Sequence, residues 1–272
     1  MADRADYDRV LADLASEHAE LDALVAGLDA DGWDMATPAE GWAVCDQISH
    51  LAFFDARALE ALTDPAAFVA GVEAALADPA GPAALMDEHV AKGRAMAPAD
   101  LLEWWRSGRD LLVEAMAAAD PNARVPWYGP PMGAVSFATA RLMETWAHGQ
   151  DVADAMGVTR LPTARLRHVA HIGVRALPFS FGLRGLPVPD EPVRVELRSP
   201  DHQVWTWGPA DATNRVRGSA IDFCLVVTQR RHRDDVRLEV DGPVADLWMQ
   251  IAQAFAGEPG PGRAPGAFRP TS

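Results

Sequence analysis

The stretch Arg141-Leu-Met-Glu-Thr-Trp-Ala-His-Gly-Gln-Asp151 decides how the first part of this chain folds, because its polar residues recur with helical spacing. In a helix, residues three and four positions apart lie on the same face. Four polar side chains then form one stripe: Arg141, Glu144, His148 and Asp151. A helix that is apolar on its other faces is expected to be buried. Its charged groups therefore need partners, and a metal ion satisfies both a carboxylate and an imidazole.

A second histidine, His50, stands in the segment Ile48-Ser-His-Leu-Ala-Phe-Phe54, which is otherwise almost wholly apolar. A histidine in such a segment needs a partner for its ring nitrogens. With Glu144 and His148 it makes a set of two imidazoles and one carboxylate, as at catalytic zinc sites, which keep a fourth position for water or substrate. The same ligand types suit Fe(II) or Ni(II). An ordinary ion pair between Glu144 and His148 explains their spacing equally well.

Composition restricts the class of protein. The chain has 272 residues, 49% of them hydrophobic, which allows two domains or one large one with a substantial core. Its formal net charge of −15 argues against binding to nucleic acid or to anionic membranes. Two cysteines, Cys45 and Cys224, are too few for a disulfide framework. We expect a cytoplasmic protein, because we find no signal peptide and no stretch of roughly 20 apolar residues.

Hydrophobic periodicity predicts four long helices in the first part of the chain. They cover residues 5–30, about 44–62, about 100–120 and about 134–156, and a fifth helix is predicted over about 163–176. Asp100-Leu-Leu-Glu103 fits a capping box at the start of the third helix. Four long helices with connections of mixed length indicate a four-helix bundle, in which metal sites are built from inward-facing side chains.

The hydrophobic period changes from 3.6 to 2 after a segment rich in proline and glycine. Residues 193–197 alternate between apolar and polar, a turn follows, and residues 204–207 predict the second strand of a hairpin. Another strand is expected at 236–240, and helices from Ser219 and over 244–255. We therefore predict an α+β protein with a helical bundle at 1–176, a linker at 177–192, a small α+β domain at 193–256 and a flexible tail at 257–272.

Several of these segments resemble the mycothiol-dependent maleylpyruvate isomerase family, whose N-terminal domain belongs to the DinB/YfiT-like metal-binding bundles. The resemblance rests on Trp33, Thr37-Pro-Ala-Glu-Gly-Trp42, Asp46-Gln-Ile-Ser-His-Leu51 and the stretch 141–151, in that order. The part from residue 216 to 257 resembles the sterol-carrier-like domain that often follows. Within this group the chain is most similar to an actinobacterial subfamily without a settled activity.

The resemblance implies a divalent metal, zinc in the first place, held by His50, Glu144 and His148, with mycothiol as the thiol cosubstrate. A free thiol has a pKa of about 8.5 and reacts as the thiolate, which coordination to a cation favours near neutral pH. The sulfur could add to the double bond of a small electrophilic substrate, permit rotation and leave, which is isomerisation, or it could displace a leaving group from the substrate, which is S-transfer. Two other classes stay open: a non-catalytic metal- or ligand-binding module and a metal-dependent hydrolase.

Other polar residues support weaker predictions. Arg141 could hold a substrate carboxylate and Asp151 could orient an imidazole, although an internal salt bridge explains them as well. Asp46 precedes His50 by one turn, where it could contact that imidazole or begin a solvated helix. Arg230, in the cluster Arg230-Arg-His-Arg233, could close over an acidic substrate or belong to a simple turn. We expect packing or surface roles for the remaining candidates, which are His18, Cys45, His89, His168, His171, His202, His232, Trp104, Trp105, Trp205 and Trp207.

Overall fold

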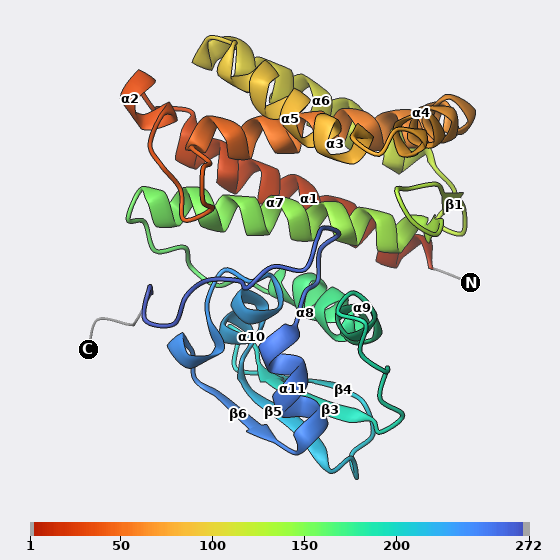
Figure 1. Ribbon diagram of the computed structural model, residues 1–272, viewed down its shortest axis with the longest axis vertical. Helices are drawn as coiled ribbons and strands as arrows, with labels where there is room; N and C mark the ends of the chain where they lie inside the picture. The colour runs from red at the N-terminus through yellow and green to blue at the C-terminus, as the bar shows by residue number, and fades with distance from the viewer. Residues whose placement is uncertain (1–2, 269–272) are drawn as a thin grey trace. The chain divides into compact units, whose positions relative to one another are not determined.

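The computed structural model describes residues 3–268, apart from the side chains of Pro82 and Met86. The chain divides into two compact units, Met1–Arg160 and Leu161–Ser272 (Figure 1). The first unit is mainly helical and the second combines helices with a sheet, so the fold class is α+β, as predicted. The division falls at residue 160 and not at the predicted 176.

Four long helices form the core of the first unit, which confirms the predicted bundle. Helices α1 and α7 pack against each other, α3 packs against both α6 and α7, and α1 also contacts α6. None of the described helices combines the length and the apolar content needed to cross a membrane. The four bundle helices are α1 (Arg4–Val25), α3 (Val44–Thr63), α6 (Pro98–Ala118) and α7 (Ala134–Ala155). Their fully buried side chains include Leu14, Leu21, Ile48, Leu51, Trp105, Leu112 and Leu142.

Local chemistry explains where two of these helices begin. At the start of α3, the carboxylate of Asp46 accepts a hydrogen bond from the backbone nitrogen of Ala43 at 2.8 Å, which satisfies one of the exposed amides of a helix start. Helix α6 begins at Pro98, whose fixed φ suits the first helical turn. The predicted capping box at Asp100 is therefore wrong. Asp100 lies inside the first turn, where its charge interacts favourably with the helix dipole.

Two further helices, for which the sequence pattern gave no prediction, lie between α3 and α6 in the chain. They are α4 (Pro65–Ala77) and α5 (Gly81–Arg94), and they contact α3 and each other. Pro65, two residues after the end of α3, is the first residue of α4, and Asp64 caps that helix by accepting from the backbone nitrogen of Ala67. The remaining elements of this unit are α2 (Ala30–Trp33) and the paired short strands β1 (Arg124–Val125) and β2 (Met132–Gly133).

Helix α5 is fixed closely against α3. Arg94 makes two hydrogen bonds to the buried carboxylate of Asp46, from Nε to Oδ1 at 2.9 Å and from Nη2 to Oδ2 at 2.8 Å. One turn along α3, Ser49 Oγ donates to the backbone oxygen of His89 at 2.5 Å. Gly93 faces the same serine, and a Cβ at this glycine would lie 2.4 Å from Ser49 Cβ. The absence of a side chain at Gly93 thus allows the two helices to approach.

Replacing Gly93 with alanine should destabilise the protein by about 1–3 kcal/mol, because the added methyl group would force α5 away from α3. Gly108 on α6 is the matched control, since a Cβ there meets nothing within 4 Å. Gly108→Ala should leave stability unchanged or raise it by up to about 1 kcal/mol. Urea unfolding of the two variants measures the difference. Equal stability of both variants would contradict the close packing of α5 on α3.

The second unit is built around a four-stranded sheet with the order β4-β3-β5-β6. Strands β3 (Val193–Arg198) and β4 (Val204–Trp207) pair antiparallel, which confirms the predicted hairpin. Strand β5 (Asn214–Ser219) runs parallel to β3, and β6 (Leu238–Asp241) pairs antiparallel with β5. Ser219 caps the following helix through Asp222, as predicted. The other elements are α8 (Leu166–Arg175), α9 (Leu177–Gly182), α10 (Ala220–Val227), the short 3-10 helix Arg233–Asp235 and α11 (Pro243–Ile251).

Packing of α8 explains why the bundle ends earlier than predicted. This helix contacts α10: Gly173 lies so close to Val227 and Phe223 that a Cβ would come within 2.6 Å of Val227. Helix α8 therefore belongs to the second unit. The predicted linker at 177–192 also needs correction, because it contains α9, which contacts α11, and Ser180 of α9 makes hydrogen bonds to the backbone of Gln253, just beyond the end of α11.

The predicted flexible tail at 257–272 has no helix or strand up to residue 268, but it is held to the second unit. The backbone nitrogen of Gly266 donates to both carboxylate oxygens of Asp235, at 2.8 and 3.0 Å. Arg184 donates to the backbone oxygen of Gly260 at 3.1 Å, and Arg231 stacks over the ring of Phe268. These contacts hold the tail against the rest of the second unit as far as residue 268. Residues 269–272 lie outside the described part of the chain.

Candidate metal centre

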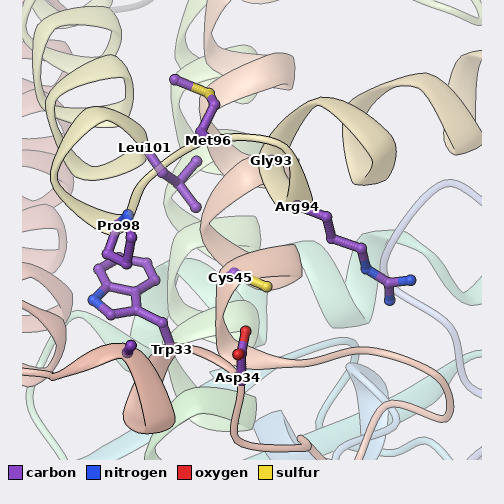
Figure 2. Close-up of a pocket in the computed structure, with 9 residues that line it drawn as sticks. Trp33, Asp34, Cys45, Gly93, Arg94, Met96, Pro98 and Leu101 are labelled. Atoms are coloured by element: carbon purple, nitrogen blue, oxygen red, sulfur yellow. The ribbon is translucent and has the colours of Figure 1, made fainter.

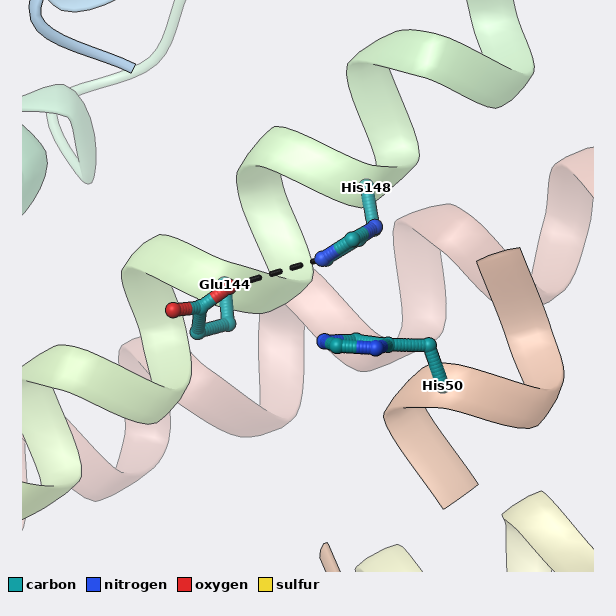
Figure 3. Close-up of side chains that lie close together, drawn as sticks. All are labelled: His50, Glu144 and His148. Carbon is teal, nitrogen blue, oxygen red and sulfur yellow. Dashed lines mark ion pairs between the residues drawn. The ribbon is translucent and has the colours of Figure 1, made fainter. Parts of the chain in front are cut away.

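The structure brings together the three residues predicted as metal ligands (Figure 3). His50 comes from α3, Glu144 and His148 come from α7, and one ligand atom of each lies within 4.8 Å of the other two. His148 Nε2 lies 3.4 Å from Glu144 Oε2. Ligands at about 2 Å from a tetrahedral ion are roughly 3.4 Å apart, so Glu144 and His148 already have that separation, and a closure of at most about 1.4 Å would bring His50 to it.

The position of the site on α7 follows from the sequence of that helix. Its side chains are buried from Arg141 to Ala153 with the exception of Glu144, whose side chain is 20% exposed, against 10% for His148. The polar stripe therefore faces the interior, and it reaches solvent mainly at the carboxylate of Glu144. This partial exposure gives a ligand an approach to the site from solvent.

A chain of hydrogen bonds fixes the ring of His148. Its Nδ1 lies 2.5 Å from Gln47 Oε1, and Gln47 Nε2 donates to Thr37 Oγ1 at 2.9 Å. The hydroxyl of Thr37 donates in turn to the backbone oxygen of Trp42. Because the amide oxygen of Gln47 can only accept, His148 carries its proton on Nδ1. The imidazole therefore directs Nε2 toward Glu144, in the form that binds metals.

His50 lies in more apolar surroundings. Its ring centroid is 4.6 Å from that of Phe54 and 5.3 Å from that of Trp42, and Trp42 also stacks on His148 with an angle of 18° between the planes. Burial, followed by the neighbouring His148, holds the pKa of His50 well below its usual value. At neutral pH His50 is therefore a neutral imidazole, which is the protonation state that a metal ligand requires.

Two residues near the ligands were missed as part of the site. Gln47 precedes His50 by three positions on α3, and this spacing on an apolar helix is a signal that could have identified it. His89, expected to have a packing or surface role, is fully buried, and its Nε2 lies 3.2 Å from His50 Nδ1. Its neighbours Asp87, Glu88 and Lys92 are typical of an exposed helix, so the sequence around His89 gave no such signal.

The other polar candidates on α3 and α7 have different partners. Arg141 binds the buried Asp55 through Nε at 3.0 Å and Nη2 at 2.8 Å, so the internal salt bridge holds and the guanidinium is engaged. Asp46 does not bind His50; its carboxylate accepts hydrogen bonds from Arg94 and from the backbone nitrogen of Ala43 at the start of α3. Asp151 is buried one turn beyond His148, and its predicted role in orienting an imidazole stays a prediction.

The candidates in the second unit have local partners. Arg230 is buried, donates from Nη1 to the backbone oxygen of Thr228 at 2.7 Å, and lies over the ring of Phe255. His171 Nδ1 accepts from Trp207 Nε1, and His232 caps the 3-10 helix. The contacts of the two histidines agree with packing or surface roles, and the choice for Arg230 between closing over an acidic substrate and a simple turn stays a prediction. In the first unit, His18 is buried against Trp105 and is not part of the cluster of His50, Glu144 and His148.

A separate cavity of about 220 Å³ lies at the start of α3 and the connection from α5 to α6 (Figure 2). Trp33, Met96 and Leu101 give it an apolar wall, and none of the three candidate ligands lines it. Cys45 borders this cavity, but burial and the nearby Asp46 and Asp34 raise the pKa of its thiol to about 11. The thiol is therefore protonated at neutral pH, and we assign it the core role predicted from the sequence.

The fold and the site together define a class of protein: a helical bundle with a two-histidine, one-glutamate candidate metal centre between two of its helices, followed by an α+β unit. The model of the family described as mycothiol maleylpyruvate isomerase N-terminal domain matches residues 14–153. The chain belongs to this family. A second family model, described as wyosine base formation, matches residues 189–239. The expected sterol-carrier-like character of the second unit stays a prediction.

Relatives agree with this membership. Two proteins of Mycobacterium tuberculosis, from strains CDC 1551 / Oshkosh and ATCC 25618 / H37Rv, are each 50% identical over 259 residues, which cover 95% of this chain and 100% of theirs. Both carry the name "Uncharacterized protein". Crystal structures of the mycothiol-dependent maleylpyruvate isomerase and of one of its mutants have TM-scores of 0.58 and 0.59 at 17% and 18% identity. Each covers 90% of this chain and 99% of the solved chain, which shows the same fold.

Proposed function

We propose that this protein is a metal-dependent enzyme that uses a low-molecular-weight thiol, mycothiol, either to isomerise a small electrophilic substrate or to bond to it through sulfur with displacement of a leaving group. The observation that carries the proposal is the convergence of His50, Glu144 and His148 in a chain of this family. The names of the two solved structures support isomerisation in particular. We further propose a cytoplasmic location and a small-molecule partner, without nucleic acid or membrane.

The donor set fits a zinc ion. Two neutral imidazoles and one carboxylate balance all but about one positive charge of Zn²⁺, so an anionic fourth ligand is favoured. When bound, the metal would favour the thiolate form of a thiol near neutral pH and so supply a nucleophile. Iron(II) and nickel(II) suit the same donors, and metal analysis of the purified protein decides among them.

The residues around the donors support this chemistry. Gln47 holds His148 with Nε2 directed toward Glu144, which reduces the rearrangement needed for metal binding. Trp42 and Phe54 cover one side of the imidazoles and exclude water there, which strengthens electrostatic interactions within the site. Glu144 is partly open to solvent, with its side chain 20% exposed. A thiol and an electrophile can therefore approach from the side of the carboxylate.

The thiol is the component that distinguishes this proposal from a binding module or a hydrolase. Addition of mycothiol to the Co(II)-substituted protein should produce a sulfur-to-metal charge-transfer band and release a proton. S-methylated mycothiol is the matched control, because it keeps the rest of the molecule but has no ionisable sulfur, and it should produce no such band. Conversion of an unsaturated, electrophilic acid should then require metal and thiol together.

Two results would overturn the proposal. If no band appears and calorimetry finds no binding of mycothiol to the metal-loaded protein, the chain is a metal- or ligand-binding module. If the metal-loaded protein hydrolyses ester or amide substrates at the same rate with and without thiol, the protein is a metal-dependent hydrolase and not a thiol-dependent enzyme.

A further inference from the structure

His89 lies directly against the candidate ligand His50, although it belongs to a different helix. Its Nε2 is 3.2 Å from His50 Nδ1, and the ring centroids are 5.0 Å apart at an angle of 69°. The side chain is fully buried, and Phe53 and Trp42 contact its ring. A buried imidazole of this kind has few other ways to satisfy its nitrogens.

The hydrogen bonds of His89 determine which nitrogen of His50 carries the proton. His89 Nδ1 lies 3.3 Å from the backbone oxygen of Leu85, and a carbonyl oxygen only accepts, so this nitrogen carries the proton of the neutral ring. His89 Nε2 is then an acceptor. The proton shared with His50 must therefore sit on His50 Nδ1, which leaves the lone pair of His50 on Nε2.

The packing of α5 places His89 at this position. The backbone oxygen of His89 accepts from Ser49, the residue before His50 on α3. One turn further along α5, Gly93 allows the close approach of the two helices, and Arg94 is bound to Asp46. From residue 89 to residue 94 along α5, the partner residues on α3 run in the opposite direction, from residue 50 back to residue 46. Together these contacts leave His89 little freedom to move away from His50.

We infer that His89 is a positioning residue of the metal centre: it fixes the ring of His50 with Nε2 available to the metal, and it links metal binding to the docking of α5 on α3. Outer hydrogen-bond partners of ligand histidines act in this way in metalloproteins. The link is reciprocal, because a metal that binds the docked form better must also stabilise docking. This inference rests on the proposed metal site, but the protonated nitrogen of His50 can be measured without metal.

If His89 had only a structural role, its replacement would change neither the nitrogen of His50 that carries the proton nor the affinity of the site for zinc. His89→Phe keeps a ring of similar size and removes the acceptor, whereas His89→Gln keeps an acceptor that can reach the same nitrogen. His18→Phe is the matched control, because His18 is also a buried histidine of the bundle and is not part of the ligand cluster. Circular dichroism establishes that each variant is folded.

The first measurement uses the metal-free wild-type protein. Nitrogen-15 NMR of the imidazole rings should find the proton of His50 on Nδ1. A proton on Nε2 would overturn the inference, whether or not any variant folds.

The second measurement is zinc affinity by competition with a chelator. His89→Phe should weaken binding about 10-fold, while His89→Gln and His18→Phe should stay within about 3-fold of wild type. Zinc should also slow amide hydrogen exchange in α5 of the wild type, and less so in His89→Phe. If His89→Phe binds zinc with wild-type affinity, the inference about His89 is wrong, but the proposed metal site is unaffected. A wild-type protein that binds no zinc would instead overturn the proposed function.

Discussion

Replacing His148 with alanine should lower the affinity for zinc at least about 100-fold while the bundle stays folded, because loss of an outer partner alone costs 10–100-fold. The imidazole supplies one of only three candidate donors, and its Nε2 faces Glu144 at 3.4 Å. Alanine removes the donor but keeps a small apolar group on a helix that is already apolar, so the packing of α7 changes little. Chelator competition measures the affinity, and circular dichroism measures the helix content.

The control for this variant is Glu73→Gln, which removes a carboxylate from an exposed position of α4. It should bind zinc like the wild type. The triple replacement of His50, Glu144 and His148 with alanine gives the sharpest test. If that variant still holds one equivalent of metal, the ligand assignment is wrong.

Replacing Arg141 with methionine should lower the free energy of unfolding by about 3–5 kcal/mol, because it leaves the carboxylate of Asp55 buried without its cation. The side chains of Arg141 and Asp55 are 4% and 0% exposed, and two hydrogen bonds join them. Burial raises the pKa of Asp55, and Arg141 opposes that shift. Without the arginine the carboxyl should bind a proton in the folded state, so the destabilisation should be smallest near pH 4 and grow as the pH rises to 7.

The double variant Asp55→Leu, Arg141→Met separates structure from function at this pair. An apolar pair of similar volume should recover most of the lost stability, which urea unfolding measures. Failure of the double variant to recover any stability would show that the pair does not act as a unit. Unchanged substrate affinity in a stable double variant would exclude the earlier hypothesis that Arg141 holds a substrate carboxylate.

The bundle and the pair of ligands on α7 could be predicted because both depend on local periodicity. Glu144 and His148 are four residues apart, and a helix places such residues on one face whatever surrounds it. His50 could be identified as a polar residue in an apolar segment, and ligand chemistry grouped it with Glu144 and His148 before the family resemblance implied the same set. The hairpin of β3 and β4 followed from alternation within a few residues. Predictions of this kind need no knowledge of distant contacts.

The rest depends on contacts between segments far apart in the chain. The sequence around His89 is polar, so only the packing of α5 on α3 identifies it as buried. Helix α8 has a clear apolar face, but its sequence does not say whether α7 or α10 will cover that face, and the predicted boundary at 176 was wrong for this reason. Strand β5 lies between β3 and β6, and its apolar positions are too few to predict it from local pattern.

The order of the chain has an evolutionary consequence. The three candidate ligands and the residues that hold them come from residues 37 to 148, within one contiguous unit. A recombination event near residue 160 could therefore replace everything downstream without removing any donor of the site. The two units match different family models. Lineages could thus inherit the donor set intact while acquiring new downstream modules.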